Sequence, residues 1–196
     1  MRIGIFAFQG DVREHVLAMR RALGDGGDVI EVRREQDLVG LNGLVIPGGE
    51  STTITTFLSR VEDVIRDLAG RIAIWGTCAG AIALSSEVLD PRGGNDPRVS
   101  PLGLISMATR RNFYGSQNDS FETTVTLEGI GGFPAVFIRA PAIVRTWGDA
   151  RPLGTFGEAH IMVRERNLLA TTFHPELVPD TRVHRYFLSM VEEVTS

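Results

Sequence analysis

Apolar residues in the first part of the chain alternate between short continuous runs and stretches with helical spacing. The continuous runs are typical of strands and occupy residues 2–8, 29–33 and 44–46. Between the first two runs, apolar residues recur every three or four positions, at Val12, Val16, Met19 and Leu23. This spacing predicts a helix that Asp11 caps, with Glu14 completing a capping box and Gly24 ending the helix.

A second amphipathic stretch follows the sequence Pro47-Gly48-Gly49-Glu50. Its apolar residues again lie at helical offsets, at Ile54, Leu58, Val61, Ile65 and Leu68. We expect Ser51 to cap this helix and Gly70 to end it. Residues 72–75 are apolar throughout, which is typical of a strand covered on both faces. After Gly76-Thr77-Cys78-Ala79-Gly80, residues 81–88 predict another helix.

The second half of the chain has a different pattern. Residues 90–101 are rich in Pro, Gly, Asp and Asn, which indicates a surface loop. Strand-like segments follow at residues 123–127, 135–138, 143–147, 161–164 and 168–173. A last helix is predicted by apolar residues at Val183, Phe187, Met190, Val191 and Val194. We therefore predict one α/β domain over residues 1–196, with an open, mainly parallel, flavodoxin-like three-layer arrangement. Helices would cover both faces of the sheet, and later strands would add an antiparallel portion.

Composition excludes several classes of function. The chain is 43% hydrophobic and 22% charged, with a net charge of −4, so it lacks the basic footprint of proteins that bind nucleic acid or anionic membranes. No apolar run approaches the roughly 18 residues of a membrane span. The single cysteine excludes an internal disulfide and a thiolate metal cluster. We expect a cytoplasmic protein that keeps this thiol free and needs neither a metal nor a cofactor.

The sequence Gly76-Thr77-Cys78-Ala79-Gly80 has the form of a nucleophile elbow, a sharp turn between a strand and a helix. Glycine is needed on either side because a Cβ there would collide with neighbouring backbone. The turn would present the Cys78 sulfur at the carboxyl end of the sheet and place the Ala79 N–H to meet an oxyanion. A lone cysteine can also be a small buried hydrophobe, and an elbow can carry a redox-sensing thiol or an esterase-like site.

The sequence Phe173-His174-Pro175-Glu176 supplies a candidate base at the end of a predicted strand. Pro175 favours extended geometry at His174, so the His174 and Glu176 side chains can converge. The carboxylate would then hold one imidazole nitrogen while the other faces Cys78. The remaining histidines, His15, His160 and His184, are expected to have surface or structural roles.

The loop Pro47-Gly48-Gly49-Glu50-Ser51 also lies between a predicted strand and a predicted helix. Its two glycines permit a close approach of the backbone, so a main-chain N–H can point at a substrate carbonyl. A phosphate cradle is the alternative interpretation. It is disfavoured because no lysine is nearby and the pattern is neither a Walker A motif nor a dinucleotide fingerprint.

Together these motifs resemble those of the class I (triad) glutamine amidotransferases, and most closely the branch that forms the glutaminase subunits of pyridoxal 5′-phosphate synthases. The similarity runs over nearly the whole chain. Its points are Gln9-Gly10 with Glu14-His15, Pro47-Gly48-Gly49-Glu50-Ser51-Thr52, Gly76–Gly80, Arg111-Asn112 with Gly115, Gln117 and Asp119-Ser120-Phe121, Phe137-Ile138-Arg139-Ala140-Pro141, and Phe173–Glu176. The family pattern has a basic residue where this chain has Ser116, and residues 90–101 look longer than usual.

The resemblance implies a role for each matching position. Cys78 would attack the glutamine carboxamide, with His174 as its base and Glu176 orienting the imidazole. The N–H groups of Gly49 and Ala79 would form the oxyanion hole. Glutamine would be bound by Gly49, Glu50, Ser51, Arg111, Ile138 and Arg139. Which arginine meets the α-carboxylate stays open at this point.

The resemblance also implies a partner. This would be a synthase subunit, a (β/α)₈ barrel that takes up the ammonia for vitamin B6 synthesis and activates the glutaminase on docking. The Gln9-Gly10 turn and the first helix are candidates for the docking surface. Two other interpretations remain: a triad amidotransferase of another pathway, or a non-catalytic thiol-sensing or binding module on the same fold. The sequence Ile138-Arg139-Ala140-Pro141 argues against the first, and His174-Pro175-Glu176 argues against the second.

Overall fold

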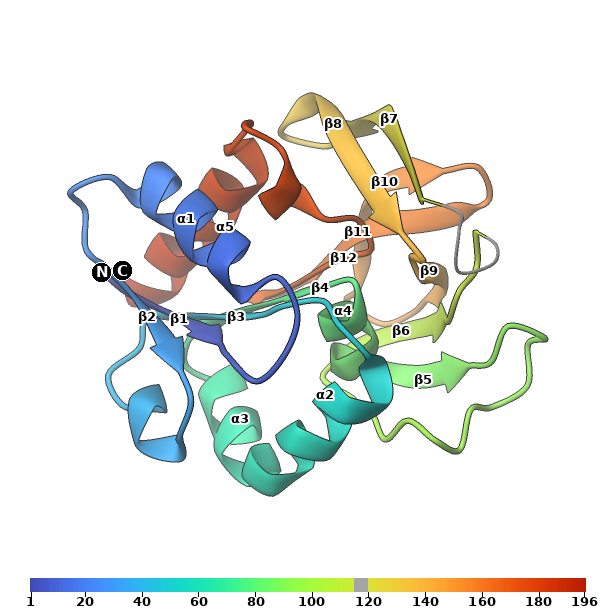
Figure 1. Cartoon of the computed structure of the whole chain (residues 1–196), viewed down its shortest axis with the longest axis horizontal. Helices are drawn as coiled ribbons and strands as arrows, with labels where there is room; N and C mark the ends of the chain where they lie inside the picture. The colour runs from blue at the N-terminus through green and yellow to red at the C-terminus, as the bar shows by residue number, and fades with distance from the viewer. Residues whose placement is uncertain (115–119) are drawn as a thin grey trace.

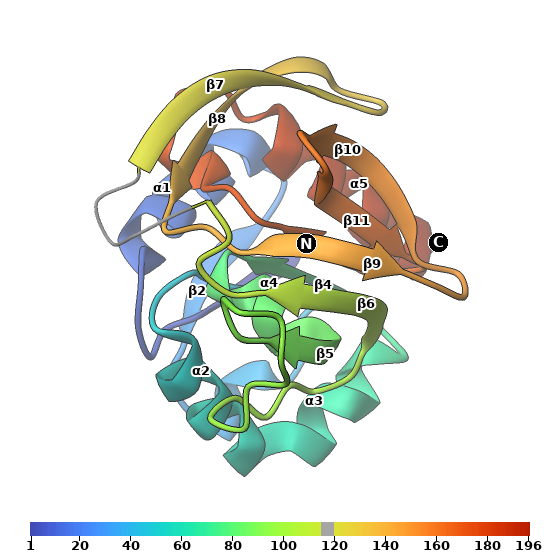
Figure 2. The same ribbon diagram turned by 90° about the vertical axis from the view of Figure 1, so that its right-hand side faces the viewer.

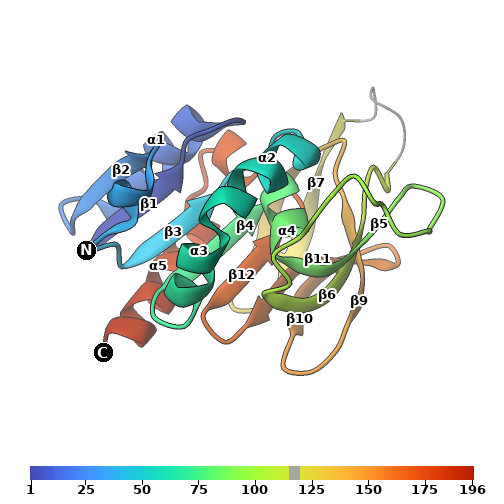
Figure 3. The same cartoon turned by 90° about the horizontal axis from the view of Figure 1, so that it is seen from below.

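Parallel strands run side by side through the centre of the computed structural model, which describes residues 1–114 and 120–196 (Figure 3). They follow the order β2-β1-β3-β4-β12, and each pairs in parallel with its neighbour. Their bounds are β1 Arg2–Phe6, β2 Asp28–Val32, β3 Gly43–Ile46, β4 Ala73–Thr77 and β12 Leu168–Thr171. β3, β4 and β12 are buried at every position, which explains their continuous apolar sequences.

Helices cover both faces of these parallel strands (Figure 1). α1 (Val12–Leu23) and α5 (Arg182–Thr195) pack together on one face, and α2 (Ser51–Leu58), α3 (Glu62–Ala69) and α4 (Ala79–Leu84) lie on the other. Side chains alternate between the two faces, so Trp75 joins the core beneath α1 and α5 while Ile74 joins the opposite core. The predicted three-layer arrangement is confirmed. Within the described part of the chain, no helix combines the length and the apolar character needed to cross a membrane.

The later strands extend the sheet with mostly antiparallel pairs (Figure 2). Beyond β12 come β11 (Ala159–Glu165), β10 (Arg151–Phe156), β7 (Ser120–Leu127) and β8 (Gly131–Ile138). A branch from β11 contains β9 (Ala142–Thr146), β6 (Ile105–Arg110) and β5 (Ser85–Leu89). The expected antiparallel portion is therefore present. The hydrophobic pattern missed β6 and β10, and β10 contains Pro152 and Gly154, where its pairing with β11 shifts register.

Two predicted helices differ from the structure in where they are interrupted or end. The stretch predicted as one helix from Ser51 to Gly70 is interrupted by a 3₁₀ turn, η2 (Ser59–Val61), that separates α2 from α3. The helix predicted over residues 81–88 ends at Leu84, and Ser85 begins β5, which pairs in parallel with β6. Pairing with β6 in the folded protein overrides the local helical pattern of these residues. Further 3₁₀ turns are η1 (Glu35–Leu38) and η3 (Pro175–Leu177).

The cap predictions are partly wrong. Asp11 is the N-cap residue of α1, as predicted, but its side chain makes no capping hydrogen bond, so the predicted capping box with Glu14 is absent. The N-cap of α2 is Glu50, whose carboxylate accepts a 2.9 Å hydrogen bond from the N–H of Thr53, and Ser51 is the first helical residue. The carboxylates of Asp11 and Glu50 both lie at the edge of the sheet described next.

Candidate active site

The carboxyl ends of β3, β4 and β12 meet at one edge of the sheet because these strands are parallel neighbours. Thr171 of β12 stands in register with Thr77 of β4, and the Cys78 N–H donates a 2.8 Å hydrogen bond to the Thr171 carbonyl. The chain leaving β4 therefore lies beside the chain leaving β12. This pairing brings Cys78 and His174, nearly one hundred residues apart, to the same edge.

Cys78 has the strained backbone of a nucleophile elbow, with φ of 49°. Both flanking glycines are required by close backbone contacts. A Cβ at Gly76 would lie 2.4 Å from the Gly80 carbonyl oxygen, and one at Gly80 would lie 2.0 Å from the Ile46 carbonyl oxygen. The predicted elbow geometry is confirmed. Cys78, 7% exposed as a residue, borders a cavity just before α4.

His174 is held by its backbone and by Glu176. Its N–H donates to the Val136 carbonyl of β8 at 2.8 Å, and its Nδ1 lies 2.7 Å from Glu176 Oε1. The predicted convergence of these two side chains is present, but η3, rather than an extended segment, brings Glu176 back to the ring. The imidazole and the cysteine meet beside Gly48, where an added Cβ would lie 2.9 Å from His174 Cε1 and 3.2 Å from Cys78 Cβ.

A second carboxylate, that of Asp11, faces the same imidazole. Asp11 Oδ2 lies 3.3 Å from His174 Nδ1, and this hydrogen bond holds the pKa of Asp11 below its ordinary value. Burial opposes a charge on His174, but the neighbouring Cys78 sulfur and the carboxylates of Asp11 and Glu176 raise its pKa well above the usual range. From the sequence, Asp11 was predicted only to cap a helix. Its position directly after the β1 strand and turn was the signal that it would reach this edge.

Two other histidines lie behind the site and are buried. His15 Nε2 is 3.0 Å from Thr77 Oγ1 and 3.3 Å from Glu176 Oε2. Burial lowers the pKa of His15, which favours the neutral form of the ring beside Glu176. His184 packs edge-on against Trp75, with ring centroids 5.1 Å apart. A surface position for these two histidines is excluded, since both are fully buried.

The cavity beside Cys78 has a volume of about 480 Å³. Its lining contains Cys78, His174, Ala79 and each residue predicted to bind glutamine, which are Gly49, Glu50, Ser51, Arg111, Ile138 and Arg139. Glu176 lies behind His174, outside the lining. Gly49 has φ of 136°, and Arg139 has φ of 44°. Gly115, Ser116, Gln117 and Asp119, which also belong to the sequence resemblance or to its departure, lie outside the described residues.

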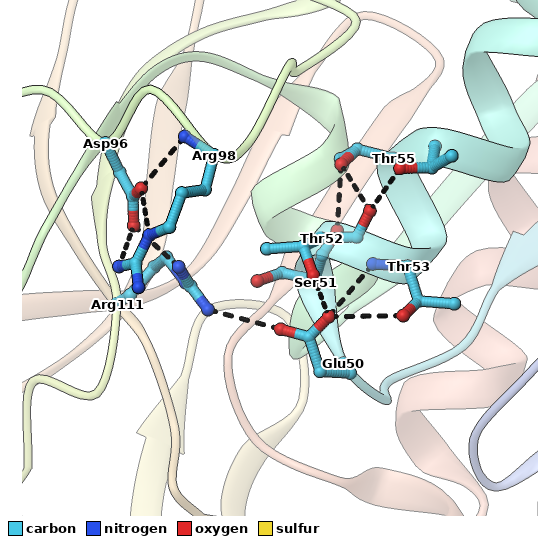
Figure 4. A network of polar contacts seen from close by, with 9 residues as sticks. Glu50, Ser51, Thr52, Thr53, Thr55, Asp96, Arg98 and Arg111 are labelled. Carbon is cyan, nitrogen blue, oxygen red and sulfur yellow. Dashed lines mark hydrogen bonds and ion pairs between the residues drawn. The ribbon is translucent and has the colours of Figure 1, made fainter.

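Arg111 enters this cavity between two carboxylates (Figure 4). Its Nη1 donates to Asp96 Oδ2 at 2.6 Å, and its Nη2 donates to Glu50 Oε1 at 3.3 Å. Asp96 lies in the loop of residues 90–101, where the sequence pattern predicted no functional residue. The loop is rich in Gly, Pro and charged residues, a composition typical of exposed segments, although the Asp96 carboxylate within it is fully buried.

The described residues contain one group with metal-ligating side chains close together, which is Asp11, His174 and Glu176, with ligand atoms within 4.8 Å of one another. Nδ1 of His174 already interacts with both carboxylates. The arrangement therefore serves to orient and charge the imidazole, and we assign no metal to it.

Comparison with known proteins is consistent across sequence and structure. The model of the SNO glutamine amidotransferase family matches residues 5–193. The chain is 49% identical over 195 residues to the pyridoxal 5′-phosphate synthase subunit PdxT of Caldivirga maquilingensis, covering 96% of this chain and 98% of the relative. The subunit PdxT of Korarchaeum cryptofilum is 48% identical over 194 residues, covering 96% and 97%. A crystal structure of a glutamine amidotransferase superposes with a TM-score of 0.87 at 41% identity, over 97% of this chain and 98% of that one. The chain belongs to the SNO glutamine amidotransferase family.

Proposed function

We propose that this chain is the glutaminase subunit of a pyridoxal 5′-phosphate synthase and hydrolyses L-glutamine to L-glutamate and ammonia. The observation that carries the proposal is the convergence of Cys78 and His174 on a cavity that also contains the residues expected to bind glutamine. Membership of the SNO family and the PdxT relatives support the pathway. The strained elbow and the carboxylate behind His174 support the chemistry over a passive thiol.

In the proposed mechanism, the Cys78 sulfur attacks the carboxamide carbon of glutamine. His174 Nε2 takes the thiol proton and then gives it to the departing ammonia, leaving a thioester that water hydrolyses to glutamate. Glu176 holds Nδ1 so that Nε2 faces the sulfur. Among the described residues, this buried Nε2 has no hydrogen-bond partner, which supports its availability for proton transfer.

The oxyanion of the tetrahedral intermediate would accept hydrogen bonds from the N–H groups of Gly49 and Ala79. The positive φ of Gly49 is a conformation that side-chain-bearing residues rarely adopt, which supports a specific role for glycine there. Glutamine would be positioned by Gly49, Glu50 and Ser51 on one side of the cavity and by Arg111 and the Ile138-Arg139 pair on the other.

The ammonia would pass to a synthase subunit, which we propose is a (β/α)₈ barrel that binds this chain in a hetero-oligomeric complex. The Gln9-Gly10 turn and α1 form the proposed docking surface. This surface adjoins the active site directly, since Gly10 and Asp11 line the cavity and an added Cβ at Gly10 would meet the Gly48 carbonyl. Neither nucleic acid nor a membrane is part of the proposal. The free Cys78 thiol suits the reducing cytoplasm.

Ammonia release from glutamine tests the proposal, with the chain alone and with the synthase subunit added. We expect the synthase to stimulate release, and Cys78→Ala and His174→Asn to abolish it. His160→Asn is a matched control, because His160 lies outside the cavity lining. No ammonia in either setting would refute the glutaminase. Ammonia release that the synthase subunit does not stimulate would contradict the partner assignment. Activity in Cys78→Ala would mean that another group is the nucleophile.

A further inference from the structure

The loop between β5 and β6 contains a buried carboxylate close to the cavity. The Asp96 side chain has no exposed surface, although its neighbours in the loop are mostly exposed. The backbone of Asp96 is tied to the sheet, because its N–H donates a 3.0 Å hydrogen bond to the Val88 carbonyl of β5. A buried carboxylate is costly unless it is paired, so its partners identify what the loop holds in place.

Asp96 binds two arginines at once (Figure 4). Oδ2 accepts from Arg111 Nη1 at 2.6 Å and from Arg98 Nη2 at 2.8 Å, and Oδ1 accepts from Arg98 Nε at 2.8 Å. These hydrogen bonds hold the pKa of Asp96 far below its usual range, so it stays ionised. The two guanidinium groups are balanced by Asp96 and by Glu50, which contacts Arg111 Nη2. When Glu50 gives up this contact, the positive charge of Arg111 is available to an anionic group in the cavity.

The two carboxylates beside Arg111 differ in strength. The Asp96 contact is short and buried, whereas the Glu50 contact is 3.3 Å long and its side chain is 45% exposed. Glu50 is also engaged with the N–H of Thr53 and the hydroxyl of Thr52 at the start of α2. Nη2 of Arg111 can therefore exchange Glu50 for an incoming carboxylate while Nη1 keeps Asp96.

We propose that Asp96 is a positioning residue for substrate: it holds Arg111 so that Nη2 meets the α-carboxylate of glutamine, and Arg98 keeps the pair positively charged. The inference rests on the proposed glutaminase function. It assigns a specificity role to the loop of residues 90–101, and it selects Arg111 rather than Arg139 as the carboxylate-binding arginine.

The test uses the complex of this chain with its synthase subunit and the substitution Asp96→Asn, which keeps the shape and removes the charge. Losing one charge-assisted hydrogen bond should raise the KM for glutamine about tenfold or more while kcat changes less than about twofold. Iodoacetamide has no carboxylate, so it should alkylate Cys78 at the same rate in the variant as in the unmodified complex. A higher concentration of glutamine should be needed to protect Cys78 of the variant from alkylation. Asp90→Asn is the matched control, because among the described residues the Asp90 carboxylate accepts hydrogen bonds only from the backbone N–H groups of Arg92 and Gly94.

A double-mutant cycle separates positioning from a general effect on the fold. In an Arg111→Gln background, Asp96→Asn should not raise the KM further, because Asp96 acts through Arg111. If Asp96→Asn does not fold, Arg98→Gln tests the same idea at an exposed side chain and should raise the KM by a smaller factor.

Three results would each overturn the inference. The first is an unchanged KM in Asp96→Asn, the second is slower alkylation together with a lower kcat, and the third is additive effects in the Arg111→Gln background. Absence of ammonia from the unmodified complex would refute the proposed function instead.

Discussion

Replacing Gly80 with alanine sets helix propensity against tertiary packing at the nucleophile elbow. Gly80 lies inside α4, where alanine is favoured over glycine by about 1 kcal/mol. The added Cβ, however, would lie 2.0 Å from the Ile46 carbonyl oxygen and 3.2 Å from the Pro47 carbonyl oxygen. Both atoms belong to backbone that leaves β3 for the Gly48-Gly49 loop, so no flexible side chain can move aside.

The magnitude of the clash decides the sign of the effect. An ordinary Cβ contact is at least 3.4 Å, so α4 and the end of β3 must separate by more than an ångström. Overpacking of this kind costs about 1–3 kcal/mol, which equals or exceeds the gain in propensity. We expect a net loss of up to about 2 kcal/mol in the free energy of unfolding. A displacement of about 1 Å at the elbow should also lower kcat/KM about a hundredfold.

Urea unfolding and ammonia release measure the two effects in the same preparation. Gly70→Ala is the control, because Gly70 ends α3 with right-handed helical geometry and its nearest contact is 3.5 Å away, at the Asp67 carbonyl oxygen. That variant should keep its activity and be neutral or more stable by about 0.4–1 kcal/mol. The reasoning is refuted if Gly80→Ala gains stability and keeps the native kcat/KM.

Further predictions concern groups packed around the imidazole of His174. Glu176→Gln should lower kcat/KM by about 10²–10⁴, because Nδ1 loses its 2.7 Å carboxylate; a fall below tenfold in ammonia release would contradict the orienting role. Asp11→Asn removes a negative charge that raises the pKa of His174, so the alkaline limb of the kcat/KM profile, where the imidazolium of the Cys78–His174 pair loses its proton, should move toward lower pH, and an unmoved limb would argue against this coupling. Burial lowers the pKa of His184 to about 3 in the folded protein, so stability present above pH 6.5 should be lost as pH falls, because the unfolded chain takes up the proton first. His184→Leu should reduce that loss by more than about 1 kcal/mol in unfolding curves at pH 7 and pH 4, whereas equal pH dependence would show that another group titrates.

Several features of this protein follow from the amino-acid sequence by itself. Helical spacing predicts α1 and α5, and continuous apolar runs predict the buried parallel strands, because each signal depends only on neighbours in the chain. The glycines around Cys78 predict the elbow for the same reason, since the steric conflict they avoid arises within one turn. His174 and Glu176 were close enough in sequence for their contact to be foreseen.

Only the tertiary structure decided which distant groups share the site and how they are charged. Asp11 looked like a helix cap and Asp96 like a loop residue, yet the fold buries Asp96 between Arg98 and Arg111 and turns Asp11 toward His174. Likewise, residues Ser85–Leu89 form strand β5 because they pair with β6, although the spacing of their apolar residues is helical. The physical reason is that local geometry follows from adjacent residues. Burial and electrostatic pairing instead depend on strand order and register, which bring together segments that no local pattern connects.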